Sequence, residues 1–380
     1  MMASDHLVLS YCQDVIIRAM TSPVPPNDRW PVSLEPYAPA PELGPDTIRL
    51  AFNESPLGPF PAALEALAAH LATQAGRYPE ADGRLIERLA AVHDLPADMI
   101  VLGNGGDAII GYVSAAYLRP GDEVITCWPS FPTYLIDAAK QEASVITVPL
   151  RDGAFDLEAM TDRVGPRTRL VWVCTPNNPT GGVVDPDDLR TFLDAVPEDV
   201  LVVIDEAYHE FCAGRPGVPA VDAVADHIQT RPNVAALRTF SKMFGLAGMR
   251  VGWLAAPAPV AVAVAKARHY YDVTGLSAIA AIASARDAAE IARRRELNAA
   301  RRARLEAGLT ALQWRWLPSQ ANFLAVDVGD ADAVSARLLA DGLATRSLSA
   351  LGAPELLRVT VGDERQIDRL LELLGPSQTI

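Results

Sequence analysis

The sequence predicts an α/β protein in which a mostly parallel, seven-stranded sheet is covered by helices on both faces, followed by a smaller α+β unit. Seven short apolar runs recur along the chain, and helical patterns such as GDAIIGYVSAAYL and DPDDLRTFLDAV lie between most of them. Strands that are apolar throughout are typical of parallel sheets buried between helices. The runs are residues 99–102, 123–126, 144–148, 169–173, 200–204, 234–237 and 250–255.

The pattern changes after residue 256. A long helical tract is expected over about 259–312, strands over 322–328 and 356–361, and a final helix at ERQIDRLLELL. The tract contains the arginine-rich stretch IARRRELNAARRARLEAGL. Because the chain as a whole is acidic, we expect these arginines to form a solvated helix face rather than a nucleic-acid site.

Composition shifts suggest four segments. Residues 1–30 lack the basic start, long apolar run and small-residue cleavage site of a secretory signal. They predict either a short helix with a Pro-rich connector or an over-extended, disordered translation start. Residues 31–75 are expected to form an arm joining the small domain. The large domain is expected over 76–265, and an interdomain helix with the small C-terminal domain over 266–380.

Charge and cysteine usage exclude several classes of function. The 380 residues carry 33 basic and 47 acidic side chains, a net charge of −14, which disfavours binding to nucleic acid or anionic lipid. No run approaches the roughly 20 apolar residues that a membrane span requires. The four cysteines are far apart with no CxxC pair, which predicts reduced thiols in a cytoplasmic protein and no metal site.

Lysine is scarce, which limits the number of candidate residues for any reaction that needs a side-chain amine. The only lysines are Lys140, Lys242 and Lys266. Lys140 lies in an ordinary amphipathic helical pattern and Lys266 follows an alanine–valine helical run, so both are expected at the surface. Lys242 lies just past a predicted strand.

Polar motifs follow the predicted strands, where ligands bind in sheets of this kind. GNGGDAII (103–110) is a Gly-rich turn entering a helix, which suits an anion or a plain structural turn. It matches neither GxGxxG nor GxxxxGK[ST]. The other motifs are CTPNNPTGG (174–182), DEAYHEF (205–211) and TFSKMFGLAGMR (239–250). Each alone could be a turn, a helix cap or a loop, but together they compose a site.

The combination NNPTG, DEAY, SK and LAGMR resembles the fold-type I pyridoxal-phosphate (PLP) aminotransferases of class I/II, and within them the histidinol-phosphate aminotransferase group. The resemblance covers roughly residues 33–375. It implies the fold-type I architecture, PLP as cofactor, small-molecule substrates and a homodimer.

The resemblance also implies which residues hold the cofactor ring. Lys242 would bind the cofactor aldehyde covalently and then act as general base. Asp205 would pair with the pyridine nitrogen, and Asn178 and Tyr208 would hydrogen-bond the ring hydroxyl. Phe131 corresponds to the aromatic residue that stacks on the ring, where the group commonly has tyrosine. Lys242, Asp205 and Tyr208 are the expected catalytic residues.

For the cofactor phosphate, the resemblance points to the backbone N–H groups of Gly106 and Asp107, the Ser241 hydroxyl and Arg250. A guanidinium binds a dianion with two parallel hydrogen bonds. Tyr78, in GRYPEADG, matches the tyrosine that reaches the neighbouring subunit's phosphate, so a dimer would be needed to complete the site.

Four further residues match family positions that bind substrate. Arg358 matches the arginine that binds the substrate α-carboxylate, and Arg346 the arginine that binds the distal phosphate. Tyr37 matches a tyrosine lining the phosphate pocket, and Asn53 opens a family segment, here FNESPLGP. Arg346, Tyr37 and Asn53 could each be structural instead.

Two departures leave the substrate open. The turn reads GGDA where the group has a small residue, Asp and Glu, and HYYDVTGLS (269–277) replaces a Pro/Phe-rich loop. Asp272 in that loop either faces the substrate and repels a phosphate, or points to solvent.

The expected reaction is transamination between a donor such as glutamate and an oxo acceptor related to histidinol phosphate or an aromatic amino acid. A decarboxylase of the threonine-phosphate type, or a specialised enzyme of elimination or cyclisation, are the alternatives. A catalytically silent binding module would be expected to lack Lys242 or Asp205, and both are present.

Overall fold

The seven apolar runs form one sheet, as the sequence predicts. A computed structural model describes residues 43–80, 82–214 and 220–377. The sheet order is β2-β8-β7-β6-β5-β3-β4, with every pair parallel except those that β8 makes. The strands are β2 (Ile100–Gly103), β3 (Glu123–Trp128), β4 (Ser144–Pro149), β5 (Thr168–Cys174), β6 (Leu201–Asp205), β7 (Val234–Thr239) and β8 (Gly252–Ala255).

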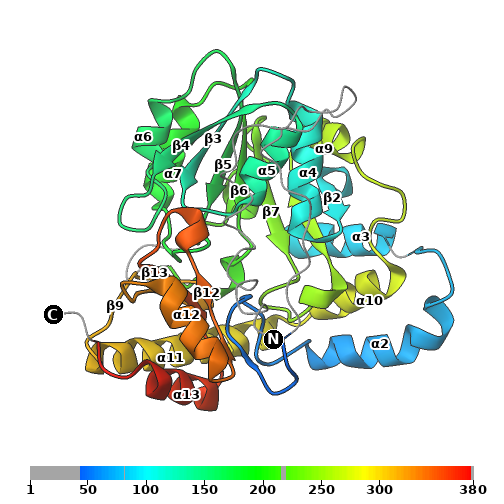
Figure 1. The fold of residues 1–380 in the computed structure, drawn as a ribbon. Coiled ribbons are helices and arrows are strands. Elements are labelled where there is room, and N and C mark those ends of the chain that lie inside the picture. The colour runs from blue at the N-terminus through cyan, green and yellow to red at the C-terminus, as the bar shows by residue number, and fades with distance from the viewer. Residues whose placement is uncertain (1–42, 81, 215–219, 378–380) are drawn as a thin grey trace, which may run out of the picture.

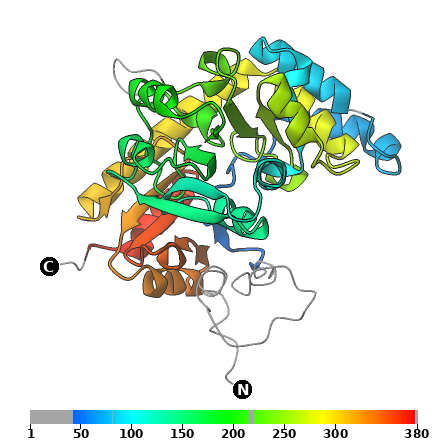
Figure 2. The ribbon, with the colours of Figure 1, turned by 90° about the horizontal axis from the view of Figure 1, so that it is seen from above.

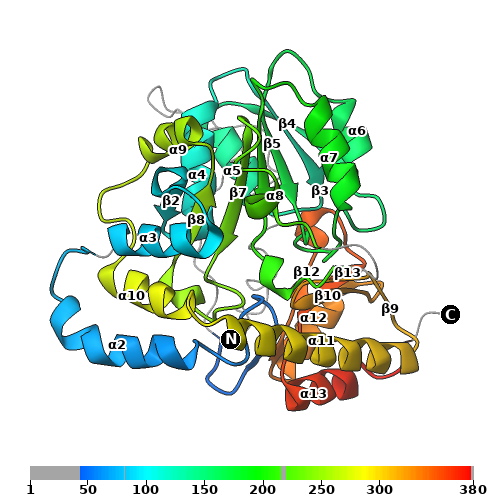
Figure 3. The same cartoon turned by 180° about the vertical axis from the view of Figure 1, so that it is seen from behind.

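Helices cover this sheet on both faces, as Figures 1 and 3 show from opposite sides. Apart from the edge strand β4, its strands are largely buried because Val, Leu and Ile fill both of their faces. The helices are α2 (Pro61–Gln74), α3 (Asp82–His93), α4 (Gly105–Tyr117), α5 (Thr133–Lys140), α6 (Leu157–Thr161), α7 (Pro186–Ala195), α8 (Ala223–Asp226), α9 (Ala258–Ala265) and α10 (Gly275–Ser284), with short 3₁₀ turns at Ala97–Met99, His209–Phe211 and Ala247–Met249.

The expected helical tract over 259–312 is three helices, because the helix is interrupted between α9 and α10 and again between α10 and α11. Tyr271 has a left-handed backbone (φ 57°), which ends any helix there. The Thr274 side chain then caps α10 by accepting a hydrogen bond from the Ser277 N–H. The third helix, α11 (Ala288–Ala311), runs along the base of the molecule to the smaller unit (Figure 3).

The smaller unit is an antiparallel sheet with its own apolar core. Its strand order is β12-β13-β10-β9, and Leu305, Leu357 and Ile367 belong to a cluster separate from the large one. It lies at the opposite end of the molecule from α2 (Figure 2). Its elements are β9 (Arg315–Trp316), β10 (Phe323–Asp327), α12 (Ala331–Ala340), β12 (Arg346–Ser347), a 3₁₀ turn (Ser349–Leu351), β13 (Leu356–Thr360) and α13 (Glu364–Leu374).

One stretch near the described N-terminal end contacts both cores. β1 (Ile48–Arg49) pairs with β11 (Leu343–Ala344), and Leu50 is buried in the smaller core. Phe60, just before α2, is buried in the larger core. The segment Leu50–Phe60 therefore links the two cores. The domain boundaries expected from the sequence stay predictions.

The arginines of α11 do not all form a solvated face. The Arg293 side chain is 55% exposed, but that of Arg294 is 4% exposed. Arg294 donates hydrogen bonds to the carbonyl oxygens of Gly58 (2.7 Å), Pro59 (3.2 Å) and Met243 (3.4 Å). The expectation is wrong for Arg294 because backbone carbonyls, rather than water, satisfy its guanidinium.

No helix in the described ranges is both long and apolar enough to cross a membrane.

Candidate active site

The motifs that follow β3, β5, β6 and β7 meet at one edge of the large sheet. Asp205 is the last residue of β6, which lies between β5 and β7. Asn178 follows β5, Phe131 follows β3, and Lys242 follows β7. Because the carboxyl ends of parallel strands share an edge, residues that are distant in sequence are brought to one place.

Asp205 is a buried carboxylate held by two hydrogen bonds. Only 4% of the residue is exposed. Its Oδ1 accepts a hydrogen bond from the Ala207 N–H (3.0 Å) and its Oδ2 from the Tyr134 hydroxyl (2.5 Å). Burial raises the pKa of Asp205 to about 6, while these two hydrogen bonds act to lower it. The carboxyl group is therefore ionised at neutral pH.

Tyr134 was not among the residues that the sequence predicted for the site. Its ring is fully buried, stacks on Trp172 with centroids 4.7 Å apart, and meets Phe131 edge-on at 5.8 Å. No local signal in the sequence identifies it, because its partner Asp205 is 71 positions away.

Lys242 is partly buried, with its amine directed at the segment that links the two cores. Nζ donates a hydrogen bond to the Phe52 carbonyl oxygen (3.1 Å) and lies 5.8 Å from the centroid of the Tyr208 ring. Burial, together with the positive charge of Arg358, lowers the pKa of Lys242 to about 8. Lys140 and Lys266 are exposed, as the sequence predicts.

Tyr208 and Asn53 form a buried pair. The Asn53 Nδ2 donates to the Tyr208 hydroxyl oxygen (2.9 Å), and the Asn53 Oδ1 accepts from the Thr360 hydroxyl (3.1 Å). Asn53 is 1% exposed and both ends of its amide are hydrogen-bonded within the protein. Its part in substrate binding stays a prediction.

The Gly-rich turn and Arg250 form a cationic, amide-rich cup. Gly106 and Asp107 lie in the first turn of α4, where backbone N–H groups lack helical partners. The Arg250 Nη2 lies 3.0 Å from the Asp107 Oδ2. A Cβ on Gly105, which has φ +79°, would come within 2.3 Å of the Arg250 Nη2, so glycine permits this close approach.

Ser241 follows β7, which ends level with β2 on the other side of β8. Thr239 of β7 and Gly103 of β2 both pair with Gly252 of β8. The Ser241 hydroxyl oxygen accepts a hydrogen bond from the Thr239 hydroxyl (2.9 Å), which leaves its own proton for another acceptor.

Asp272 follows neither of the alternatives considered from the sequence. Its carboxylate accepts a hydrogen bond from the Asn104 N–H (2.8 Å), and its carbonyl oxygen accepts one from the Asn104 Nδ2 (2.9 Å). Asn104 directly precedes α4. The carboxylate therefore fixes the Gly-rich turn instead of facing substrate or bulk solvent.

Two arginines share one face of the smaller sheet. Arg346 of β12 lies directly opposite Arg358 of β13. The Arg358 guanidinium donates to the Asn178 Oδ1 (2.5 Å) and to the Ala51 carbonyl oxygen (2.6 Å). These bonds join the smaller sheet to the loop after β5.

Of the two remaining expected residues, the structure describes Tyr78 alone. Tyr78 is 75% exposed and stacks on Tyr271, with ring centroids 4.5 Å apart. Tyr37 lies outside the described residues.

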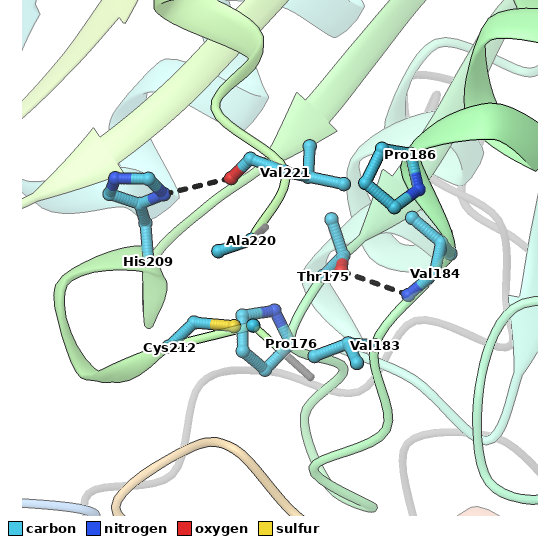
Figure 4. A pocket seen from close by; sticks show the side chains of 10 residues that line it. Thr175, Pro176, Val183, Val184, Pro186, His209, Cys212, Ala220 and Val221 are labelled. Atoms are coloured by element: carbon cyan, nitrogen blue, oxygen red, sulfur yellow. Dashed lines mark hydrogen bonds between the residues drawn. The ribbon is translucent and has the colours of Figure 1, made fainter. Parts of the chain in front are cut away.

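The small pocket in Figure 4 is a different place. It is lined by residues that follow β5 and β6, including Thr175, His209 and Cys212, and by Val221, whose carbonyl oxygen lies 3.0 Å from the His209 Nδ1. It contains none of the predicted cofactor or substrate residues. We therefore locate the site by the chemistry of Lys242 and Asp205.

The residues fit the expected cofactor group by group. Lys242 offers an amine of lowered pKa. A carboxylate has about four acceptor positions, and Ala207 and Tyr134 use two of those on Asp205. Arg250, the first turn of α4 and Ser241 supply the cation and donors that a phosphate needs.

Comparisons with known proteins agree with this geometry. Residues 45–374 match the family model described as aminotransferase class I and II. The chain is 40% identical over 354 residues to histidinol-phosphate aminotransferase 2 of Pseudomonas aeruginosa, covering 90% of this chain and 95% of that protein. It is 38% identical over 350 residues to an aromatic amino acid aminotransferase of Corynebacterium jeikeium, covering 90% and 91%.

Among solved structures, the fold is similar to histidinol-phosphate aminotransferase from Sinorhizobium meliloti in complex with pyridoxal-5'-phosphate. The TM-score is 0.79 at 29% identity, over 88% of this chain and 95% of that one.

Proposed function

Because the chain belongs to the class I and II aminotransferase family, we propose that it transfers an amino group between glutamate and the oxo form of histidinol phosphate. The reaction is a PLP-dependent transamination. An aromatic 2-oxo acid is the second candidate acceptor, which the Corynebacterium jeikeium relative favours. The names of the relatives favour transamination over the decarboxylase, elimination and cyclisation alternatives.

The observation that carries the proposal is the meeting of Lys242, Tyr208 and Arg358 from three separate segments. Lys242 would hold the cofactor aldehyde, Asp205 the pyridine nitrogen, Asn178 and Tyr208 the ring hydroxyl, and Phe131 the ring face. Gly106, Asp107, Ser241 and Arg250 would hold the phosphate. When bound, the cofactor supplies an electron-accepting ring that stabilises negative charge at the substrate Cα.

Lys242 then moves the proton. An amine with a pKa of about 8 is partly neutral at neutral pH. It would therefore take the proton from the substrate Cα and release it to the cofactor carbon. The Phe52 carbonyl oxygen accepts a hydrogen bond from the amine and so orients it. Ionised Asp205 would keep the pyridine nitrogen of the bound cofactor protonated.

The paired arginines would bind the substrate anion. Arg358, already oriented by Asn178 and Ala51, would bind the carboxylate of glutamate. Arg346, on the same sheet face, would add the second guanidinium that a phosphate dianion needs.

A homodimer would complete the site. The exposure of Tyr78 suits a side chain that reaches a neighbouring subunit's phosphate. The buried free thiols of Cys127, Cys174 and Cys212 support a cytoplasmic location, where thiols stay reduced.

A half-reaction screen tests the substrate proposal. Purified holoenzyme would be mixed separately with glutamate, histidinol phosphate, phenylalanine, tyrosine, threonine phosphate and arginine, and the visible cofactor absorbance followed. We expect rapid conversion with glutamate and histidinol phosphate. Conversion with phenylalanine but not histidinol phosphate would favour the aromatic candidate, and carbon dioxide release from threonine phosphate would refute transamination.

A further inference from the structure

We propose that Tyr134 is a positioning residue for the reaction: its hydroxyl holds Asp205 ionised and in one orientation for the cofactor's pyridine nitrogen. The 2.5 Å hydrogen bond from this hydroxyl to the Asp205 Oδ2 carries the proposal. In the described part of the chain, no other side chain donates a hydrogen bond to the Asp205 carboxylate; its second hydrogen bond is from the Ala207 backbone.

Packing holds the Tyr134 side chain in one orientation. Its ring lies nearly parallel to Trp172 (9°) at 4.7 Å and meets the Phe131 ring at 80°. Both Tyr134 and Trp172 are fully buried. A rotation of the tyrosine about χ1 would open a cavity and leave its hydroxyl without a partner, and both are costly in a packed core. The hydroxyl is therefore a fixed donor.

The pKa shifts of Tyr134 and Asp205 agree with the hydroxyl donating and the carboxylate accepting this hydrogen bond. Burial, and then the negative charge of Asp205, raise the pKa of Tyr134 well above its usual value, so the phenol keeps its proton and donates. Burial pushes Asp205 toward its neutral form, whereas a hydrogen bond to the carboxylate favours the charged form. The tyrosine thus opposes the effect of burial on Asp205.

Glu206, the acidic residue next to Asp205 in the chain, is hydrogen-bonded to other groups. It accepts a hydrogen bond from the Arg238 Nε (3.0 Å) and one from the Ala223 N–H (2.8 Å). Arg238 also donates to Asp222 (2.7 Å). The Glu206 carboxyl group is thereby held by Arg238 and Ala223, so it does not hydrogen-bond to Asp205.

The test is Tyr134→Phe, which removes the hydroxyl and keeps the stacked ring. Holoenzyme carrying ¹⁵N-labelled pyridoxal phosphate would be studied by NMR without substrate, so the result does not depend on the substrate proposed above. We expect the pyridine nitrogen resonance to move toward its unprotonated position. The acid limb of the kcat/KM profile should move up by about one pH unit, the size of one hydrogen bond to a charged group. Tyr117→Phe makes the same change at the far end of α4 and should alter neither readout.

Two further measurements separate positioning from mere packing. Replacing Tyr134 by 3-fluorotyrosine keeps the fold and makes the hydroxyl a stronger donor, so the acid limb should move to lower pH. In an Asp205→Asn background, Tyr134→Phe should produce no additional change in the pyridine nitrogen resonance.

The outcomes are decisive in both directions. A Tyr134→Phe enzyme that loses thermal stability while its nitrogen resonance and acid limb stay unchanged would overturn the proposal. The proposal would also be wrong if Tyr134→Phe changed the resonance equally with Asn at position 205, or if fluorotyrosine left the pH profile in place.

Discussion

Arg346 and Arg358 are cross-strand neighbours, placed directly opposite each other in the antiparallel pair β12–β13. Side chains at such positions leave the same face of a sheet and lie close together, and two like charges there repel. An anion on this face of the sheet would lie within reach of both guanidinium groups, and guanidinium groups bind carboxylates and phosphates with parallel hydrogen bonds.

Substitution of each arginine should distinguish two kinds of substrate. Arg358→Gln should lower kcat/KM for glutamate and for histidinol phosphate by about 100-fold or more, because a charged bidentate contact is lost. Arg346→Gln should have that effect on histidinol phosphate and a much smaller one on glutamate. Steady-state kinetics with both substrates gives the comparison. Equal losses for the two substrates in Arg346→Gln would contradict the role as a phosphate contact.

Lys242 should be the most reactive lysine near neutral pH. With a pKa of about 8, about one in ten of its amines is neutral at pH 7, against fewer than about one in a thousand for an ordinary lysine of pKa about 10.4. Cofactor-free protein treated briefly with acetic anhydride should be acetylated first at Lys242, as read by peptide mass spectrometry, with the rate rising with pH and levelling above about 8.

Bound cofactor should protect Lys242 and leave Lys140 and Lys266 unaffected. Preferential labelling of Lys140 in the cofactor-free protein would show that the Lys242 amine is not the activated one.

Arg294 should matter far more for stability than Arg293, although both pair with Glu290. Arg294→Gln leaves the carbonyl oxygens of Gly58, Pro59 and Met243 without their charged donor, so the free energy of unfolding should fall by about 3 kcal/mol. Arg293→Gln removes only a surface pair, worth less than about 1 kcal/mol. Urea unfolding of both holoenzymes makes the comparison, and similar losses would mean that Arg294 is not a structural tie.

Asp272 should support cofactor binding through the Gly-rich turn. Asp272→Ala removes the acceptor of the Asn104 N–H, and the dissociation constant of pyridoxal phosphate should rise about tenfold, as for one charge-assisted hydrogen bond. Asp272→Asn keeps an acceptor oxygen and should weaken binding less. Fluorescence titration of cofactor-free protein provides the constants. An unchanged constant in Asp272→Ala would place the phosphate contact elsewhere.

The large sheet could be predicted from the sequence because its strands are apolar throughout. All seven runs became strands of one sheet, and the motifs at their ends came together for the same topological reason. Periodicity alone does not reveal the break at Tyr271, since it continues on either side, whereas the family resemblance indicates a loop at 269–277. Contacts between Asp272 and Asn104, far apart in the chain, fix that turn.

The buried partners of the site residues could not be predicted either, because they are distant in the sequence or belong to the main chain. Tyr134 and Asp205 are separated by 71 positions, and no local pattern joins them. Arg294 looks like a surface residue in a charged helix, yet three of its partners are main-chain oxygens, which any residue type provides. Hydrogen bonds to main-chain acceptors therefore cannot be predicted from the pattern of side chains.

The segment from Leu50 to Phe60 is anchored at one end in the smaller core and at the other in the larger, and between these anchors it presents the Phe52 carbonyl to Lys242. A movement of the smaller core relative to the larger one would therefore displace this segment at the residue that contacts the Lys242 amine. The relative position of the two cores and the surroundings of the Lys242 nitrogen are thus mechanically coupled.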